Sequence, residues 1–222
     1  MKQLFVGLFT EGTTDVQFLE SIVQRTIEQV AFECTGQIET ELKIIKIDKT
    51  GKDFVTQVLS ASKKGMDDYG ITLLCVQTDA DQASLEPTYK NKIIPAQDKL
   101  SQQNEHDYCK VLAAIVPIQE VEAWMLADKS LLKIQIGTTK SDADLGIHRP
   151  PESIANPKEV IEAAIRIERQ DLTKRRRKNL SIAELYLPIG QAMDLKTLAT
   201  LPSYNNFQEN IRAAFRTLHL LH

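Results

Sequence analysis

The sequence has no strong excess of charge of either sign. Its 222 residues include 27 Lys and Arg against 30 Asp and Glu, which gives a formal net charge of -3 at pH 7. Proteins that attract nucleic acid through a general positive field carry a clear basic excess. Contact with a polyanion would therefore have to come from a local basic patch or from bound cations. The hydrophobic share of 42% is enough for a substantial core.

Cysteine and histidine are too scattered to indicate a zinc site. Cys34, Cys75 and Cys109 form no C-x-x-C pair, and the four histidines show no ligand spacing. We expect these cysteines to be reduced thiols, as in a cytoplasmic protein.

Long hydrophobic runs and several common functional motifs are also missing. The apolar stretch from Leu4 to Phe9 is followed by Glu11, well before it could form a signal-peptide core or a membrane span. The sequence has no Gly-x-Gly-x-x-Gly or Walker loop and no Gly-x-Ser-x-Gly elbow. We therefore expect no membrane association, and neither a P-loop nucleotide site nor a serine hydrolase is indicated.

Short apolar runs alternate with helical periodicities through the first ~130 residues. We expect strands at 4–9, 42–47, 71–76 and 111–116, and helices within 16–30, 54–70 and 120–126. A further helix within 85–104 is expected to be interrupted around Pro95. This order predicts right-handed βαβ crossovers and an α/β fold with a mostly parallel sheet covered by helices.

The strand pattern does not resume after a stretch rich in Gly, Pro, Ser and Asp at 137–157. We expect an α/β domain over 1–130, a connecting loop over 131–157, and a C-terminal α-helical extension over 158–222 that packs on the sheet domain.

Acidic residues follow three of the four expected strands. Because the carboxyl ends of neighbouring parallel strands meet at one rim of a sheet, these side chains are expected to converge. Carboxylate oxygens are the ligands that Mg²⁺ and Mn²⁺ prefer. The candidate metal ligands are Glu11, Asp15, Asp79, Asp81, Glu120 and Glu122.

Within this set, Asp79 and Asp81 can reach one ion because residues i and i+2 of extended backbone project to the same side. Glu11 could share that ion or accept a proton. Asp15 could equally be a first-turn acid favoured by the helix dipole. If 120–126 is a helix from its start, Glu120 and Glu122 point about 200° apart, and we favour Glu122 as the inward residue.

A second Asp-Ala-Asp occurs at Asp142 and Asp144, in an expected loop with no strand before it. We interpret this copy as solvated turn residues.

The order of these motifs resembles the Toprim fold of topoisomerases, bacterial primases and overcoming-lysogenization-defect nucleases. That family has a Glu followed by Gly after its first strand and an Asp-x-Asp after its third, as in Glu11-Gly12 and Asp79-Ala80-Asp81 here. The resemblance covers roughly residues 1–128. The spacing of Glu11 and Asp15 is similar to the nuclease branch, and the segments at 116–128 and 202–207 are similar to uncharacterised bacterial Toprim-like proteins.

The resemblance implies a Mg²⁺- or Mn²⁺-dependent nuclease with Glu11, Asp79 and Asp81 as catalytic residues, and a role in bacterial defence against phage or other foreign DNA would fit. Asp15 with Glu120 or Glu122 would hold or orient a second ion. Nucleic acid is the implied partner, DNA in preference to RNA, and a protein partner such as an ATPase remains open. No ATPase, zinc module or second topoisomerase domain is recognisable in the sequence.

One dense basic run could supply the missing positive charge, and it could equally be a solvated helix end. It consists of Lys174, Arg175, Arg176, Arg177 and Lys178. The alternative function is a non-catalytic Mg²⁺-binding module that acts through a protein partner.

Overall fold

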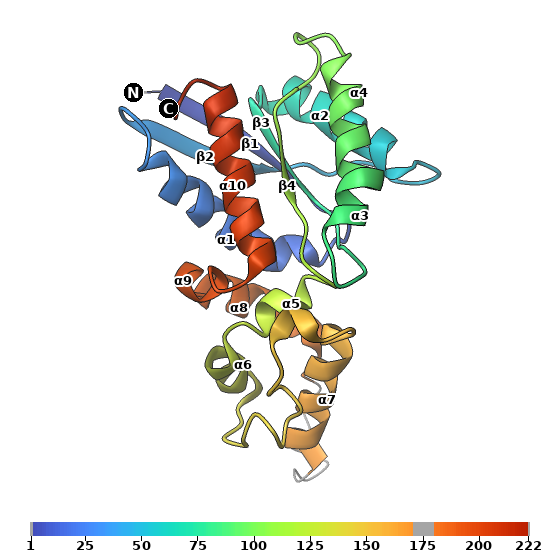
Figure 1. Cartoon of the computed structure of the whole chain (residues 1–222), viewed down its shortest axis with the longest axis vertical. Helices are drawn as coiled ribbons and strands as arrows, with labels where there is room; N and C mark the ends of the chain where they lie inside the picture. Colours follow the sequence, from blue (N-terminus) through green and yellow to red (C-terminus); the bar gives the residue numbers. More distant parts are fainter. Residues whose placement is uncertain (1, 171–179, 222) are drawn as a thin grey trace.

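The centre of the molecule is a four-stranded parallel sheet with the strand order β2-β1-β3-β4 (Figure 1). The computed structural model describes residues 2–170 and 180–221. The strands are β1 (Lys2–Phe9), β2 (Ile38–Ile44), β3 (Leu73–Gln77) and β4 (Leu112–Ile115). The expected α/β fold with a parallel, helix-covered sheet is confirmed.

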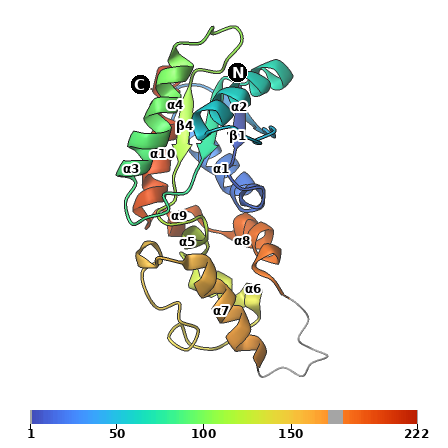
Figure 2. The ribbon, with the colours of Figure 1, turned by 90° about the vertical axis from the view of Figure 1, so that its right-hand side faces the viewer.

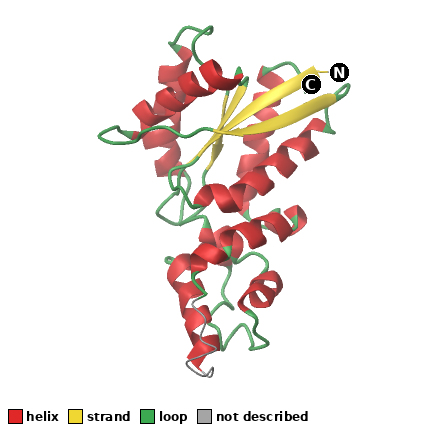
Figure 3. Ribbon diagram, turned by 180° about the vertical axis from the view of Figure 1, so that it is seen from behind, coloured by secondary structure: helices red, strands yellow, loops and turns green. Residues whose placement is uncertain are grey.

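Helices cover both faces of the sheet, which explains why the inner strands are almost continuously apolar. Alternate residues of β1, β3 and β4 belong to two separate core clusters, one on each face. Helices α1 (Asp15–Ala31) and α10 (Pro202–Thr217) lie on one face. Helix α2 (Phe54–Tyr69) and the helical segment at 86–101 lie on the other (Figure 3).

The segment at 86–101 stays helical through Pro95, although we expected an interruption there. It consists of α3 (Glu86–Thr88), a π-helical turn η1 (Tyr89–Ile93) and α4 (Ile94–Ser101). Proline has no N–H and clashes with the carbonyl one turn earlier. The wider π-helical turn ends at Ile93, two residues before Pro95, so the irregularity is taken up as a bulge and the helix does not end.

Most of the chain after β4 is helical and extends past the carboxyl ends of the strands (Figure 2). The elements are α5 (Glu122–Met125), α6 (Lys129–Ile136), η2 (Pro151–Ser153), α7 (Pro157–Gln170), η3 (Ile182–Glu184), α8 (Tyr186–Ala192), α9 (Leu195–Leu198) and α10. Helix α7 packs on α5, α8 packs on α1, and α10 packs on β4 and α1. The range 131–157, expected to be a connecting loop, therefore contains most of α6.

The α6 helix has clear end signals in the sequence. The Asp128 side chain accepts a hydrogen bond from the N–H of Leu131 at 2.9 Å, and Gly137 ends the helix with φ 82°. An N-terminal Asp and a C-terminal left-handed Gly are typical helix boundaries.

A buried aromatic cluster fixes α5 against α10. The rings of Trp124 and Tyr204 meet edge to face with centroids 5.3 Å apart, and Phe207 packs beside both. Trp124 Nε1 donates a hydrogen bond to Ser203 Oγ at 2.7 Å. Because Glu122 lies half a turn before Trp124, this cluster also fixes the position of the Glu122 carboxylate.

Within the described residues, no helix is both long enough and apolar enough to cross a membrane.

Candidate functional site

All six candidate carboxylates line one pocket of about 320 Å³ at the carboxyl ends of β1 and β3. The helical part of the chain closes its other side, where α5, α7 and α8 begin. The lining residues are Glu11, Gly12, Thr14, Asp15, Asp79, Asp81, Glu120, Glu122, Lys158 and Tyr186. The sequence therefore identified the acidic side chains of this pocket, and topology brings them together.

Gln77, the last residue of β3, connects the first two acidic segments. Its side chain is fully buried. Gln77 Oε1 accepts a hydrogen bond from the Glu11 N–H at 3.0 Å, and Gln77 Nε2 donates to Asp79 Oδ1 at 3.0 Å. Both amide functions are thus used, and they set the spacing between Glu11 and Asp79.

Glu11 is surrounded by hydrogen-bond donors. Thr78 Oγ1 donates to Glu11 Oε2 at 2.5 Å, and Lys92 Nζ lies 3.4 Å from the same oxygen. Lys92 Nζ also donates to Thr78 Oγ1 at 2.8 Å. On the other side, Lys49 Nζ donates to the carbonyl oxygens of Thr10 and Glu11 at 2.7 and 2.6 Å. Two ammonium groups therefore offset part of the negative charge at this end of the pocket.

Asp79 experiences the strongest electrostatic effect of the cluster. Burial, followed by the charges of Asp15, Glu122, Asp81 and Glu11, raises the pKa of Asp79 to about 8. Burial and neighbouring like charges both disfavour the ionised form of a carboxyl. Without a cation in the pocket, Asp79 is therefore mostly protonated at neutral pH.

Asp15 is also held inside the cluster and is more than a helix-end acid. Its Oδ2 accepts a hydrogen bond from the Gly12 N–H at 3.0 Å. Burial raises the pKa of Asp15, with further upward contributions from Glu122 and Glu11, while the Gly12 hydrogen bond and Lys49 oppose them. The balance is unfavourable for the charged form, because burial and the like charges outweigh the Gly12 hydrogen bond and Lys49.

Glu120 and Glu122 both line the pocket. The geometric argument for choosing between them assumed one helix from Glu120, whereas α5 begins at Glu122 and Glu120 lies in the preceding turn. Glu122 is 6% exposed, and its Oε1 accepts a hydrogen bond from the Tyr186 hydroxyl. Burial, followed by this hydrogen bond, raises the pKa of Tyr186, so the phenol keeps its proton.

Glu120 carries an unpartnered oxygen. Its Oε2 atom is buried and has no hydrogen-bond partner among the described residues. Burial and Glu122 raise the pKa of Glu120, and a hydrogen bond from the Lys158 backbone opposes this. Buried polar atoms without a partner are rare in folded proteins and often mark the place of a ligand or ion.

The loop that carries Asp81 has an uncommon backbone. Asp81 and Gln119 both have left-handed φ values, 55° and 64°. Their main chains are joined by a hydrogen bond from the Asp81 N–H to the Gln119 carbonyl oxygen at 3.0 Å. Non-glycine residues in this region are strained and concentrate at functional sites. This pairing ties the loop after β3 to the loop after β4.

As the side chains stand, no group of three or more His, Cys, Asp or Glu among the described residues is arranged to hold a metal ion. Protein donors instead hold the carboxylates one by one, as Gln77, Thr78 and Tyr186 do.

The basic run Lys174–Lys178 lies outside the described residues. Sequence reasoning missed Gln77, Lys92, Lys158 and Tyr186 as parts of the site. Gln77 and Lys92 had a usable signal, because Gln77 ends a strand two residues before Asp79 and Lys92 lies in the helix that follows. Lys158 and Tyr186 had none, since they reach the pocket from the distant helices α7 and α8.

No family model, curated protein or solved structure matches this chain.

Proposed function

We propose that this protein is a Mg²⁺- or Mn²⁺-dependent nuclease that hydrolyses phosphodiester bonds at the acidic pocket. The single observation that supports the proposal best is the convergence of six carboxylates on one pocket of about 320 Å³. A cluster of acids without a cation is electrostatically unfavourable, as the raised pKa of Asp79 indicates. The proposal extends to DNA in preference to RNA and to action with a protein partner such as an ATPase, on the Toprim resemblance alone.

The six acidic residues of the pocket offer carboxylate oxygens, the ligands that a hard divalent cation prefers. One of these oxygens, Glu120 Oε2, is buried and has no hydrogen-bond partner among the described residues. Glu11, Asp79 and Asp81 would hold one ion, and Asp15 with Glu120 or Glu122 a second. When bound, such ions supply positive charge that stabilises the developing negative charge on the phosphate and lowers the pKa of water.

The chain's own residues orient the carboxylates and offset part of their negative charge. Gln77 keeps Glu11 and Asp79 at a fixed separation. The Tyr186 hydroxyl donates to Glu122 and holds that carboxylate in one orientation. Lys92 and Lys158 stand at the edges of the acidic surface, where an ammonium group can contact a phosphate oxygen.

The test is cleavage of labelled single-stranded DNA, duplex DNA and RNA in Mg²⁺, Mn²⁺ or EDTA, comparing the native protein with Glu11→Gln. We expect cleavage with the divalent ions, none in EDTA, and a loss of roughly a hundredfold or more in the variant. Glu41→Gln, on an exposed strand residue away from the pocket, is the matched control and should cleave normally.

Calorimetric titration with Mn²⁺ separates the two candidate functions. Metal binding without cleavage of any of the three substrates would reject the nuclease and favour the non-catalytic module. Cleavage that persists unchanged in Glu11→Gln would reject this pocket as the site.

A further inference from the structure

Strand β2 lies at the edge of the sheet and pairs with β1 on one side only, among the strands that the structure describes. The Lys2 N–H donates to the Gln37 carbonyl oxygen, and the Ile45 N–H donates to the Leu8 carbonyl oxygen, at 3.0 and 2.8 Å. Because parallel ladders use alternate residues, the main-chain groups of Thr40 and Leu42 point away from β1. The Thr40 carbonyl oxygen accepts a long hydrogen bond from Gln24 Nε2 at 3.4 Å. Exposed strand edges of this kind are templates for another strand.

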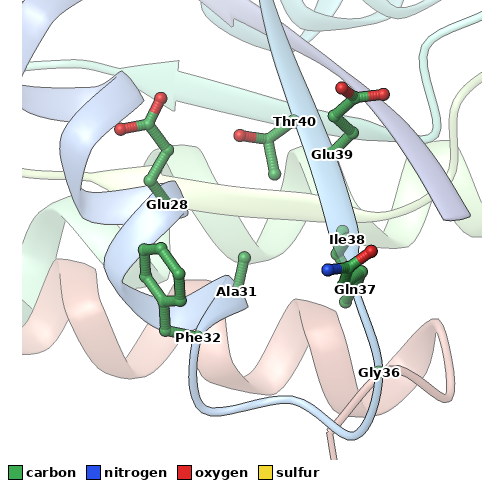
Figure 4. A pocket seen from close by; sticks show the side chains of 8 residues that line it. All are labelled: Glu28, Ala31, Phe32, Gly36, Gln37, Ile38, Glu39 and Thr40. Atoms are coloured by element: carbon green, nitrogen blue, oxygen red, sulfur yellow. The ribbon is translucent and has the colours of Figure 1, made fainter. Parts of the chain in front are cut away.

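A groove runs beside this edge, between β2 and the end of α1. It has a volume of about 490 Å³ and is lined by Glu28, Ala31, Phe32, Gly36, Gln37, Ile38, Glu39 and Thr40. Figure 4 shows the α1 residues and the β2 residues on opposite sides of the opening, with the turn through Gly36 joining them. A groove between a helix and an open strand edge has the shape that accepts an extended peptide.

The α1 side of the groove combines two apolar residues, Ala31 and Phe32, with Glu28. The Phe32 side chain is 91% exposed, the largest exposure among the described large hydrophobic residues. Ile38 and Leu42 on β2 are only partly buried and belong to the core cluster on the α1 face. An added strand would place every second side chain against this surface.

The other face of β2 is acidic. Glu39 and Glu41 are exposed and lie on the opposite face from Ile38 and Leu42. Lys43 pairs with Glu41, while Glu39 has no such partner among the described residues. The groove itself is lined by two glutamates and no Lys or Arg. The intervening side chains of an added strand would therefore meet negative charge.

We propose that the β2 edge and the groove beside it bind an extended segment of another protein by strand addition. The segment carries apolar side chains at alternate positions, facing Phe32 and Ile38, and Lys or Arg between them, facing Glu39. A second copy of β2 fits less well because it would bring its own Glu39 and Glu41 to the same acidic face. This surface is separate from the acidic pocket and does not depend on the nuclease proposal.

The experiment measures fluorescence anisotropy of a labelled heptapeptide that alternates Val and Lys. The decisive variant is Thr40→Pro, because the Thr40 N–H points outward and its loss removes no hydrogen bond to β1. The native protein should bind saturably, and Thr40→Pro should bind at least about tenfold more weakly. Thr40→Val keeps the N–H and is the matched control, which should bind like the native protein.

Surface variants keep the proposal testable if Thr40→Pro does not fold, which circular dichroism will show. Glu39→Lys and Phe32→Ser should each weaken peptide binding several-fold, and a Val-Glu heptapeptide should not bind. Absence of saturable binding to the native protein, or equal binding by the folded Thr40→Pro and Thr40→Val proteins, overturns the proposal. A native dimer by light scattering that Thr40→Pro dissociates also overturns it, since a second copy would then occupy the edge.

Discussion

The tripeptide Asp-Ala-Asp occurs at 79–81 and again at 142–144, and the two copies occupy opposite environments. The first follows a buried strand, and burial together with four neighbouring carboxylates raises the pKa of Asp79. The second lies in a turn, where Ser141 Oγ and N–H donate to Asp144 Oδ2 at 2.6 and 3.3 Å and lower the pKa of Asp144. In the same turn, Asp142 pairs with Lys133 at 2.7 Å.

The difference shows that this motif has no chemistry of its own. A strand end in a parallel sheet brings acids from other strands close together, so charge accumulates. A surface turn satisfies each carboxylate locally with hydroxyl, N–H and ammonium donors. Only the first copy therefore lies among carboxylates whose like charges raise its pKa together with burial.

The largest expected effect is on catalysis. Asp79→Asn should reduce metal-dependent cleavage by roughly a hundredfold or more, because it removes a proposed ligand. Asp142→Asn, the same change in the other copy, should leave the rate unchanged. Single-turnover cleavage of labelled DNA measures both. Equal losses in the two variants would remove the distinction between the copies.

The second largest expected effect is on the pH dependence of stability, which Asp79 should influence and Asp142 should not. The pKa of Asp79 is about 8 in the folded protein against an ordinary value of 3.8, so folding favours its protonated form. Its favourable contribution is therefore fully present at acidic pH and is lost as the pH rises towards and through 8. In EDTA, Asp79→Asn should raise the free energy of unfolding at pH 8 by about 2 kcal/mol and flatten this slope.

Urea unfolding between pH 4 and pH 9 provides the measurement, with Asp142→Asn as the control that keeps the native slope. A native protein whose stability rises over this range would contradict the assigned direction of the Asp79 shift.

Each Asp-Ala-Asp copy has one supporting residue, Gln77 for the first and Ser141 for the second, and changing it should have a smaller effect than changing Asp79. Gln77→Met should destabilise the fold by about 1–2 kcal/mol, since the Glu11 N–H and the Asp79 carboxyl both lose their buried partner. It should also lower cleavage by disturbing the spacing of the two acids. Thermal melting and cleavage assays test both effects, and an unaltered cleavage rate would show that Gln77 does not position the site.

The smallest expected effect belongs to Ser141→Ala. The pKa of Asp144 should rise towards its ordinary value because its main donor is lost. No measurable change in melting temperature or cleavage is expected, since Asp144 is exposed. Carboxyl NMR titration follows the pKa directly, and an unshifted Asp144 would contradict the assigned hydrogen bond.

The local sequence pattern was sufficient to predict most of the strands and the acidic residues of the pocket. The apolar runs before Glu11 and Asp79 predicted buried strands, and their parallel order predicted that the acids meet. The local sequence pattern was insufficient where tertiary packing decides how far a helix extends or which distant side chains meet. The π-helical turn before Pro95 keeps a helix that proline alone would end, and the sequence around Tyr186 gives no sign that its hydroxyl reaches Glu122.

The helix boundary at Glu122 illustrates the same limit on a smaller scale. A shift of two residues in the start of α5 decides whether Glu120 and Glu122 compete or both line the pocket. Helix ends are set by capping and by packing against neighbours, which local periodicity does not specify.

The aromatic contact between Trp124 and α10 has a consequence for the order of events on the ribosome. Translation delivers β1, β3 and their acids before α10, and Ser203, which helps to hold α5, follows Trp124 by 79 residues. Domains assemble as their segments emerge. A nascent chain that stops before residue 202 lacks the support for Glu122, so the acidic pocket is completed only after α10 has been made.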